Sequence, residues 1–132
     1  MQQSQIVLVD SPVSRYLDCF ADTAEPTVVL GHTHMPFDRL ADRRRFVNPG
    51  SVGMPYGRAG AHWALLGPTV SLRHVDYDAA HAAETFRSSA PDYPGLAQFI
   101  EQNVLTVPSD AEALSVFTDW AHRDDEDPRR EE

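Results

Sequence analysis

The stretch Gly31-His32-Thr33-His34 places two imidazoles one residue apart, directly after an apolar run. Neutral imidazole suits zinc, manganese, iron or nickel, so this is where the sequence first indicates chemistry. The pair does not fix the identity of the metal, and it can serve one ion or two adjacent ions. The alternative interpretation is a surface turn with two solvated histidines that bind nothing.

The element before the histidines must position them. Residues 27–30, Thr-Val-Val-Leu, are too few for a helix and lie between Pro26 and Gly31, which predicts a buried strand. The segment GHTHMP then leaves the strand as a turn. Histidines at the carboxyl end of such a strand can both face the crevice where α/β sheets bind ligands.

Further elements are indicated on both sides of the histidines. Strands are predicted at 45–47, 62–66 and 69–75, the last two as a hairpin, and residues 5–9 as a short strand or an irregular lead-in. Helices are predicted at 12–21, 78–87 and 93–105, and after Ser109. Ser11 is expected to cap the first helix and Asp78 the second, while Ser109 and Glu112 match a capping box.

Composition limits the class of protein. The chain has 132 residues, enough for one domain or part of one, and a formal net charge of -9. This acidic balance argues against binding to nucleic acid and to anionic membranes. The first residues resemble neither a secretory signal nor a transmembrane helix, so we expect a cytoplasmic protein. The single cysteine, Cys19, leaves any metal to imidazole and carboxylate ligands.

Three segments taken together, GHTHMPFDR, RFVNPGSVGMPYG and AHWALLG, carry a family resemblance. Their order and spacing resemble the C-terminal half of the calcineurin-like metallophosphoesterases, in the branch of small bacterial phosphodiesterases. The resemblance implies an α/β (α+β) fold that is part of a β-sandwich flanked by helices, with the N-terminal half absent. We expect residues 1–123 to form a partial metallophosphoesterase domain, most similar over 27–76 and with C-terminal helices at 78–123. Residues 124–132 are expected to be a disordered acidic tail.

The resemblance also implies a site. In this family two metal ions hydrolyse phosphodiesters or phosphomonoesters, and His32 matches a ligand of one metal and His34 a ligand of the other. Gly31 would allow the tight turn. An Asn-Pro-Gly-Ser turn would support the loop that carries His32 and His34, called the histidine loop, without ligating metal. That supporting turn comprises Asn48, Pro49, Gly50 and Ser51. The implied cofactor is a divalent metal, and the implied substrate is a phosphorylated small molecule or a phosphodiester.

The sequence departs from the family before Gly31. Family members have Asp-x-His, Gly-Asp, Gly-Asn and a lone histidine ahead of Gly-His-x-His, and none of these is present here. The carboxylates in that segment are Asp10, Asp18, Asp22 and Glu25. Two histidines do not hold a dinuclear centre, so a homodimer, a complementary chain or a longer natural product would supply the other ligands. The alternatives are a catalytically incomplete remnant that acts as a metal-binding or interaction module, and a structural protein with incidental histidines.

Other polar residues are assigned by their position in the sequence. Asp38 and Asp42 are expected in a solvated loop before the strand at 45–47, with a metal ligand as the alternative for Asp38. Arg43, Arg44 and Arg45 are expected to be exposed on a hairpin approach to that strand, with attraction of a phosphate group as the alternative. Tyr56 and Arg58 follow the supporting turn closely enough to reach a substrate in a complete enzyme. The histidines without a motif are expected to be structural, namely His62, His74, His81 and His122.

Overall fold

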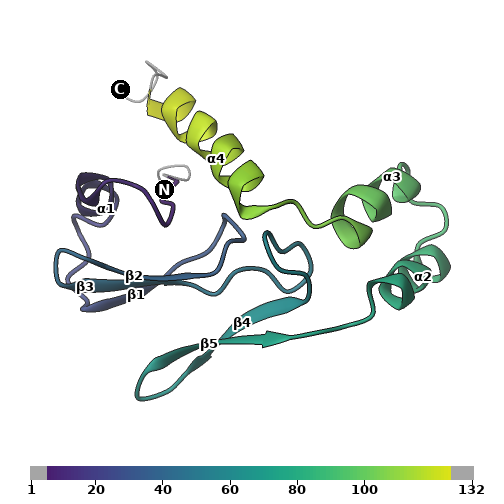
Figure 1. The fold of residues 1–132 in the computed structure, drawn as a ribbon, viewed down its shortest axis with the longest axis horizontal. Helices are drawn as coiled ribbons and strands as arrows, with labels where there is room; N and C mark the ends of the chain where they lie inside the picture. Colours follow the sequence, from purple (N-terminus) through teal and green to yellow (C-terminus); the bar gives the residue numbers. More distant parts are fainter. Residues whose placement is uncertain (1–5, 126–132) are drawn as a thin grey trace.

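The computed structural model describes residues 6–125, a mixed arrangement of helices around two small sheets (Figure 1). The elements are α1 (Val13–Cys19), β1 (Thr27–Val29), β2 (Phe37–Ala41), β3 (Arg44–Asn48), β4 (Ala61–Leu66), β5 (Val70–Val75), α2 (Ala79–Ser89), α3 (Leu96–Ile100), the π-helical segment η1 (Glu101–Leu105) and α4 (Asp110–Asp125). The predicted α/β (α+β) class is confirmed. None of the helices in residues 6–125 has the length and apolar character needed to cross a membrane.

The three-stranded sheet has the order β1-β3-β2, with β1 parallel and β2 antiparallel to β3. Helix α1 covers one face of this sheet, where the ring centroids of Tyr16 and Phe46 are 4.8 Å apart (Figure 1). The Tyr16 hydroxyl donates a hydrogen bond of 2.6 Å to the carbonyl of Leu8. Burial raises the pKa of this phenol, and the nearby Arg39 opposes the rise. The apolar centre of β3 therefore forms the core beside the candidate site.

Strand β2 corrects the prediction of a solvated loop. Its end residues Phe37 and Ala41 are buried, whereas Asp38 between them is exposed. The two-residue turn Asp42-Arg43 joins β2 to β3, and both residues have positive φ, 47° and 62°. These angles match a type I′ hairpin turn, which usually carries Asn-Gly or Asp-Gly. The sequence signal was missed because arginine stands where glycine is usual.

Strand β1 corrects a second prediction. It ends at Val29 rather than at Leu30, and it is not a buried strand, because the Val29 side chain is 43% exposed. Within residues 6–125, β1 pairs only with β3 and forms an edge of the sheet. Parallel strands are normally covered on both faces, so the burial expected from composition depended on neighbours that these residues do not provide.

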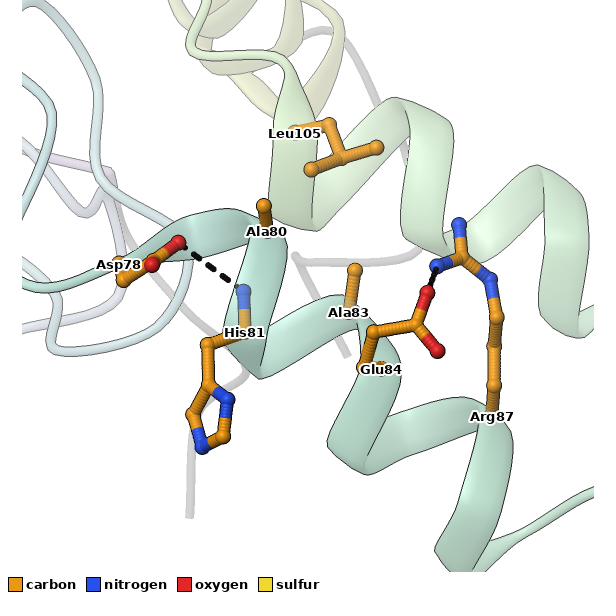
Figure 2. A pocket seen from close by; sticks show the side chains of 7 residues that line it. All are labelled: Asp78, Ala80, His81, Ala83, Glu84, Arg87 and Leu105. Carbon is orange, nitrogen blue, oxygen red and sulfur yellow. Dashed lines mark hydrogen bonds and ion pairs between the residues drawn. The ribbon is translucent and has the colours of Figure 1, made fainter.

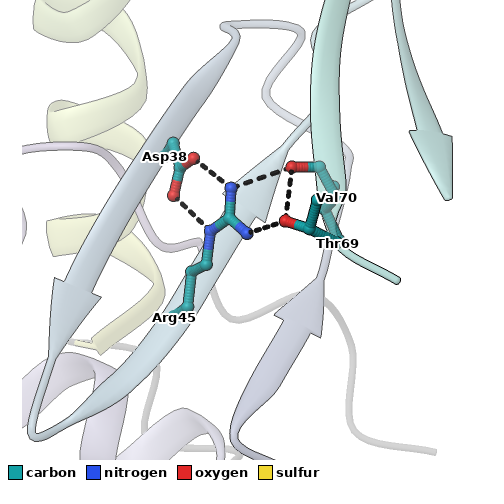
Figure 3. Close-up of polar contacts among 4 residues, drawn as sticks. All are labelled: Asp38, Arg45, Thr69 and Val70. Atoms are coloured by element: carbon teal, nitrogen blue, oxygen red, sulfur yellow. Dashed lines mark hydrogen bonds and ion pairs between the residues drawn. The ribbon is translucent and has the colours of Figure 1, made fainter. Parts of the chain in front are cut away.

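The hairpin of β4 and β5 confirms the prediction of paired strands at 62–66 and 69–75. Arg45 of β3 links this hairpin to the three-stranded sheet (Figure 3). Its guanidinium donates to both carboxylate oxygens of Asp38, at 2.9 and 2.6 Å. It also donates to the Thr69 hydroxyl at 3.1 Å and to the Val70 carbonyl at 2.9 Å. Asp38 therefore orients an arginine that holds the two sheets together.

Replacing Asp38 with asparagine should loosen this link in a pH-dependent way. The hydrogen bond from Arg45 lowers the pKa of Asp38 below its usual value, so the native state favours the ionised carboxylate. Its stabilisation is complete above the unfolded-state pKa of about 4 and is lost as the pH falls through the lower native value. We expect Asp38→Asn to lower the melting temperature at pH 7 and to have less effect at pH 2.5.

Thermal unfolding at the two pH values measures this difference, with the exposed Asp18→Asn as a control. An equal decrease in the melting temperature of Asp38→Asn at both pH values would contradict the ionic link. The link is partly exposed to solvent, since the Asp38 side chain is 40% accessible, and we therefore expect a modest shift.

Two predicted helix starts are confirmed and a third is wrong. The Ser109 amide donates to Glu112 Oε2 at 2.9 Å, and the Glu112 amide donates to Ser109 Oγ at 3.2 Å, which completes the capping box of α4. Asp78 accepts from the amide of His81 at the start of α2. Ser11 does not cap α1, because its hydroxyl accepts from the amide of Leu8 and Pro12 occupies the cap position.

The ends of the described chain differ in form. Residues 6–8 are irregular and buried, which agrees with the lead-in alternative rather than the strand, and residue 5 lies outside the described residues. Helix α4 extends to Asp125, two residues into the segment 124–132 that was expected to be disordered. Residues 126–132 lie outside the described residues. The short elements α2, α3 and η1 pack on one another on the far side of the molecule from α1 (Figure 1).

Candidate functional site

The loop that carries the two histidines connects β1 to β2. His32 and His34 have φ angles of 78° and 59°, in the left-handed region that few residues other than glycine adopt. This conformation costs roughly 1–2 kcal/mol per residue. Thr33 between them is buried, whereas His32 is exposed and His34 is half-buried. Contacts elsewhere must therefore stabilise the loop.

Asn48, at the end of β3, provides several of these contacts. Its side chain is fully buried, and its amide nitrogen donates to the Gly31 carbonyl at 3.2 Å and to the Thr33 hydroxyl at 3.1 Å. Its side-chain oxygen accepts from the Gly50 amide at 2.9 Å. One residue thus joins the histidine loop to the Asn-Pro-Gly-Ser turn.

The rest of that turn packs closely against its neighbours. Gly50 has a φ of 85°, and a β-carbon there would lie 2.9 Å from His62 Cβ and 3.1 Å from Pro36 Cδ. Ser51 accepts from the Met54 amide through its hydroxyl and from the His62 amide through its carbonyl. The turn therefore connects the histidine loop, the loop that contains Met54, and β4. Pro49 is half-buried within it.

The ring of His34 has a defined partner. Its Nδ1 lies 3.0 Å from the carbonyl oxygen of Met54, and because a carbonyl only accepts, Nδ1 carries the proton. The lone pair of Nε2 is then left for a ligand, as in histidines that bind metals and donate their other nitrogen to a carbonyl. No described residue hydrogen-bonds the exposed ring of His32. The two side chains fit a pair of metal ligands.

The described residues bring no further ligand to this pair of histidines. Among the side chains that the structure describes, no three His, Cys, Asp or Glu residues cluster in a way that could hold a metal ion. Asp38 pairs with Arg45, and Asp42 lies in the turn at the opposite end of β2 from the histidine loop. The described residues therefore fit part of a metal centre and lack a bridging carboxylate.

Of the polar residues between the supporting turn and the end of β5, Tyr56 lies at the histidine loop, and the others lie on or near the β4–β5 hairpin. Tyr56 lies against the ring of His34, with centroids 5.8 Å apart and planes 24° apart. Arg58 is exposed, with its Nη2 3.8 Å from Asp76 Oδ1. His62 and His74 donate to the carbonyls of Arg58 and Ala59, at 2.9 and 2.6 Å, and their rings are 4.7 Å apart.

These hairpin histidines therefore fix the path of the chain at residues 58–59. Sequence reasoning assigned them a structural role without identifying it. Their positions directly opposite one another on the predicted hairpin were the available signal.

A pocket of about 340 Å³ lies apart from the histidine loop (Figure 2). It is lined by Asp78, Ala80, His81, Ala83, Glu84, Arg87 and Leu105. Three of its polar side chains are already engaged, since Asp78 caps α2 and Arg87 pairs with Glu84. None of the histidine-loop residues contributes to this pocket, so the two features are separate.

Comparison with known proteins agrees with the geometry of the loop. The calcineurin-like phosphoesterase superfamily domain matches residues 2–69, which include the histidine loop and the supporting turn. No curated protein matches the chain. A crystal structure of a hypothetical protein from Pyrococcus horikoshii OT3 is similar in fold, with a TM-score of 0.55 and 22% identity. The match covers 76% of this chain and 41% of that one.

The present chain thus spans less than half the length of that protein, and their likeness concerns the fold. The superfamily is generally metal-dependent, which agrees with a free Nε2 on His34. The domain match covers more than half of the chain and both candidate ligands. The chain belongs to the calcineurin-like phosphoesterase superfamily.

Proposed function

We propose that this chain supplies the Gly-His-x-His half of a two-metal phosphoesterase site. His32 would bind one divalent metal and His34 the other, and the complete site would hydrolyse phosphodiesters or phosphomonoesters. The observation that carries the proposal is the bond of His34 Nδ1 to the Met54 carbonyl, which leaves Nε2 available. Manganese, zinc, iron and nickel all suit such ligands.

The cost of the loop conformation supports the same proposal. Two non-glycine residues with positive φ, separated by a single residue, are unfavourable, and a buried asparagine is committed to holding the loop that contains them. Such conformations cluster at functional sites because a surrounding structure must maintain them. An incidental surface turn has no need for this arrangement at both histidines.

The roles of this chain follow from its contacts. When bound, the metal pair would supply Lewis acidity toward the phosphate oxygens and the attacking water. His32 and His34 would hold the metals, and Asn48 would keep the two side chains at a fixed spacing through its bonds to Gly31 and Thr33. The Met54 carbonyl would keep the proton of His34 on Nδ1, away from the metal.

The remaining ligands would come from a second copy, a complementary chain or further residues of a longer protein. Within residues 6–125 one edge of β1 is unpaired and Val29 is exposed, which supports such a partner, because an unpaired strand edge readily accepts another strand. Trp63, Leu65 and Val75 lie on one face of the β4–β5 hairpin and are also exposed. An apolar surface of this kind is typical of an interface.

A second candidate function is a catalytically incomplete module that binds metal or a protein partner. The observation that favours it is the lack of a third ligand among the side chains that the structure describes. This candidate shares the metal-binding histidines with the first and differs in the absence of hydrolysis. Turnover therefore separates the two.

Replacing both His32 and His34 with alanine should abolish metal binding. Manganese and zinc titration calorimetry on the full chain measures affinity and stoichiometry, and hydrolysis of bis(4-nitrophenyl) phosphate measures turnover. Histidine is a direct ligand in this account, so we expect the affinity to fall by at least about 10- to 100-fold, the range for loss of a supporting contact. His81→Ala is the matched control, because His81 is exposed on α2.

Binding of nearly two metal ions per chain or per dimer, together with turnover, would support the enzyme. Binding without turnover that depends on both histidines would support the module. Binding that is unchanged in the double variant would contradict both functions.

A further inference from the structure

Helix α4 lies beyond the segment that matches the superfamily domain, yet it contacts the surroundings of His34. We propose that Tyr56 and Phe117 are positioning residues that fix the plane and the tautomer of the His34 ring. The importance of this role for metal binding rests on the proposed function. The contacts themselves can be tested without any metal.

A chain of aromatic contacts leads from α4 to His34. The Phe117 ring meets the Tyr56 ring edge-on, with centroids 5.9 Å apart and planes 76° apart. The Tyr56 ring in turn stacks on His34 at 5.8 Å. Both arrangements fall in the range of favourable aromatic pairs. Phe117 is itself buried, so it provides a fixed support.

The residue after His34 is held by the same helix. Met35 is buried in one cluster with Ala113 and Phe117 of α4, and Tyr56 packs against that cluster. Helix α4 therefore contacts the chain next to His34 as well as the residue that stacks on its ring. A shift of α4 would displace both.

The loop of residues 54–57 is also attached to the start of α4. The Gly57 amide donates to the Pro108 carbonyl at 2.9 Å, and a β-carbon on Gly57 would collide with the carboxylate of Asp110. This loop carries both partners of His34, the Met54 carbonyl and the Tyr56 ring. Its position therefore sets the position of the imidazole.

Two restraints of different kind act on the imidazole. The hydrogen bond to Met54 fixes one edge of the ring but permits rotation about the bond axis, and the Tyr56 stack restricts that rotation. The lone pair of Nε2 lies in the ring plane, so this plane decides which position a metal can occupy. Metal ligands need such support to stay within about 0.5 Å of a productive geometry.

The Tyr56 hydroxyl has no hydrogen-bond partner among the described residues, so the ring alone should carry the effect. This predicts that Tyr56→Phe keeps the His34 tautomer and ring plane of the natural chain, whereas Tyr56→Leu and Phe117→Leu release the imidazole. Long-range proton–nitrogen NMR spectra of the full chain report the His34 tautomer. We expect the Nδ1–H form in the natural chain and a mixture of both tautomers, with ring protons shifted toward solvent-exposed values, in the two leucine variants.

Tyr93→Leu is the matched control, because Tyr93 is 59% exposed and belongs to the segment before α3. Circular dichroism confirms that each variant is folded, and Tyr56→Leu removes no fully buried side chain. Zinc affinity should fall about 10- to 100-fold in Tyr56→Leu, as for other residues that support a ligand. An unchanged His34 tautomer and ring shift in Tyr56→Leu would overturn the proposal.

The same measurements separate this proposal from the proposed function. A changed His34 tautomer in Tyr56→Leu, with metal binding insensitive to His34→Ala, would support the positioning role and refute the metal site. Metal binding lost in His34→Ala, with an unchanged tautomer and affinity in Tyr56→Leu, would support the metal site and refute the positioning role.

Discussion

Replacing Asn48 with aspartate should lower the free energy of unfolding by about 3 kcal/mol, because a buried donor is lost and a charge is buried in its place. Aspartate has nearly the same shape as asparagine but its carboxylate only accepts hydrogen bonds. The Gly31 carbonyl would then face an oxygen instead of the amide that now donates at 3.2 Å. We therefore expect the histidine loop to lose its protection from hydrogen exchange.

Urea unfolding gives the free energy, and amide exchange at residues 31–35 reports the loop. Asn103→Asp is the matched control, because Asn103 is half-buried and makes one side-chain hydrogen bond, to the Phe99 carbonyl. This control should lose about 1 kcal/mol. A loss in Asn48→Asp no greater than in the control would show that Asn48 does not hold the loop.

Replacing Gly50 with alanine should lower the free energy of unfolding by about 2–5 kcal/mol. A side chain at the observed φ of 85° costs roughly 1–2 kcal/mol, and overpacking adds about 1–3 kcal/mol. The new β-carbon would meet His62 Cβ and the Pro36 ring, neither of which is the end of a flexible side chain. Because Pro36 is the last residue of the histidine loop, metal affinity should fall together with stability.

Gly53→Ala is the matched control in the same segment. Gly53 does not have a positive φ, and a β-carbon there would have no neighbour within 4 Å. Chemical denaturation of both variants tests the comparison. Equal stability of Gly50→Ala and Gly53→Ala would contradict the close packing of the supporting turn.

Elements with a strong local signal were predicted from the sequence. The capping box at Ser109 and the cap at Asp78 start α4 and α2 because each satisfies backbone amides within one turn. The hairpin of β4 and β5 was predicted because its alternating pattern is interrupted by Gly67-Pro68. In these cases, neighbours in the sequence determine the local structure.

Elements that depend on distant neighbours were predicted less well. Strand β2 forms because β3 pairs with it, although its charged residues and its Asp42-Arg43 turn resemble a loop. Strand β1 has the composition of a buried strand and lies at an edge, because burial depends on strands that a local pattern does not reveal. In both cases, tertiary context decided the result.

At the candidate site, too, local features were predicted from the sequence and contacts between distant segments were not. The spacing of His32 and His34 was visible in the sequence, as was the turn that begins at Asn48. The stack of Tyr56 on His34 and its support by Phe117 were not predicted, because they join segments far apart in the chain. Sequence spacing identifies the candidate ligands, and the fold shows how they are held.

The most direct test of the proposed metal site is paramagnetic broadening of histidine NMR signals by Mn²⁺ added to the full chain. We expect the signals of His32 and His34 to broaden at lower Mn²⁺ concentrations than those of His81 and of His122, which lies near the acidic end of the chain. The selective broadening should disappear when His32 and His34 are both replaced with alanine, as judged from nearby Thr33. Equal broadening of all histidines, or broadening that begins at His122, would contradict a metal site at the histidine loop.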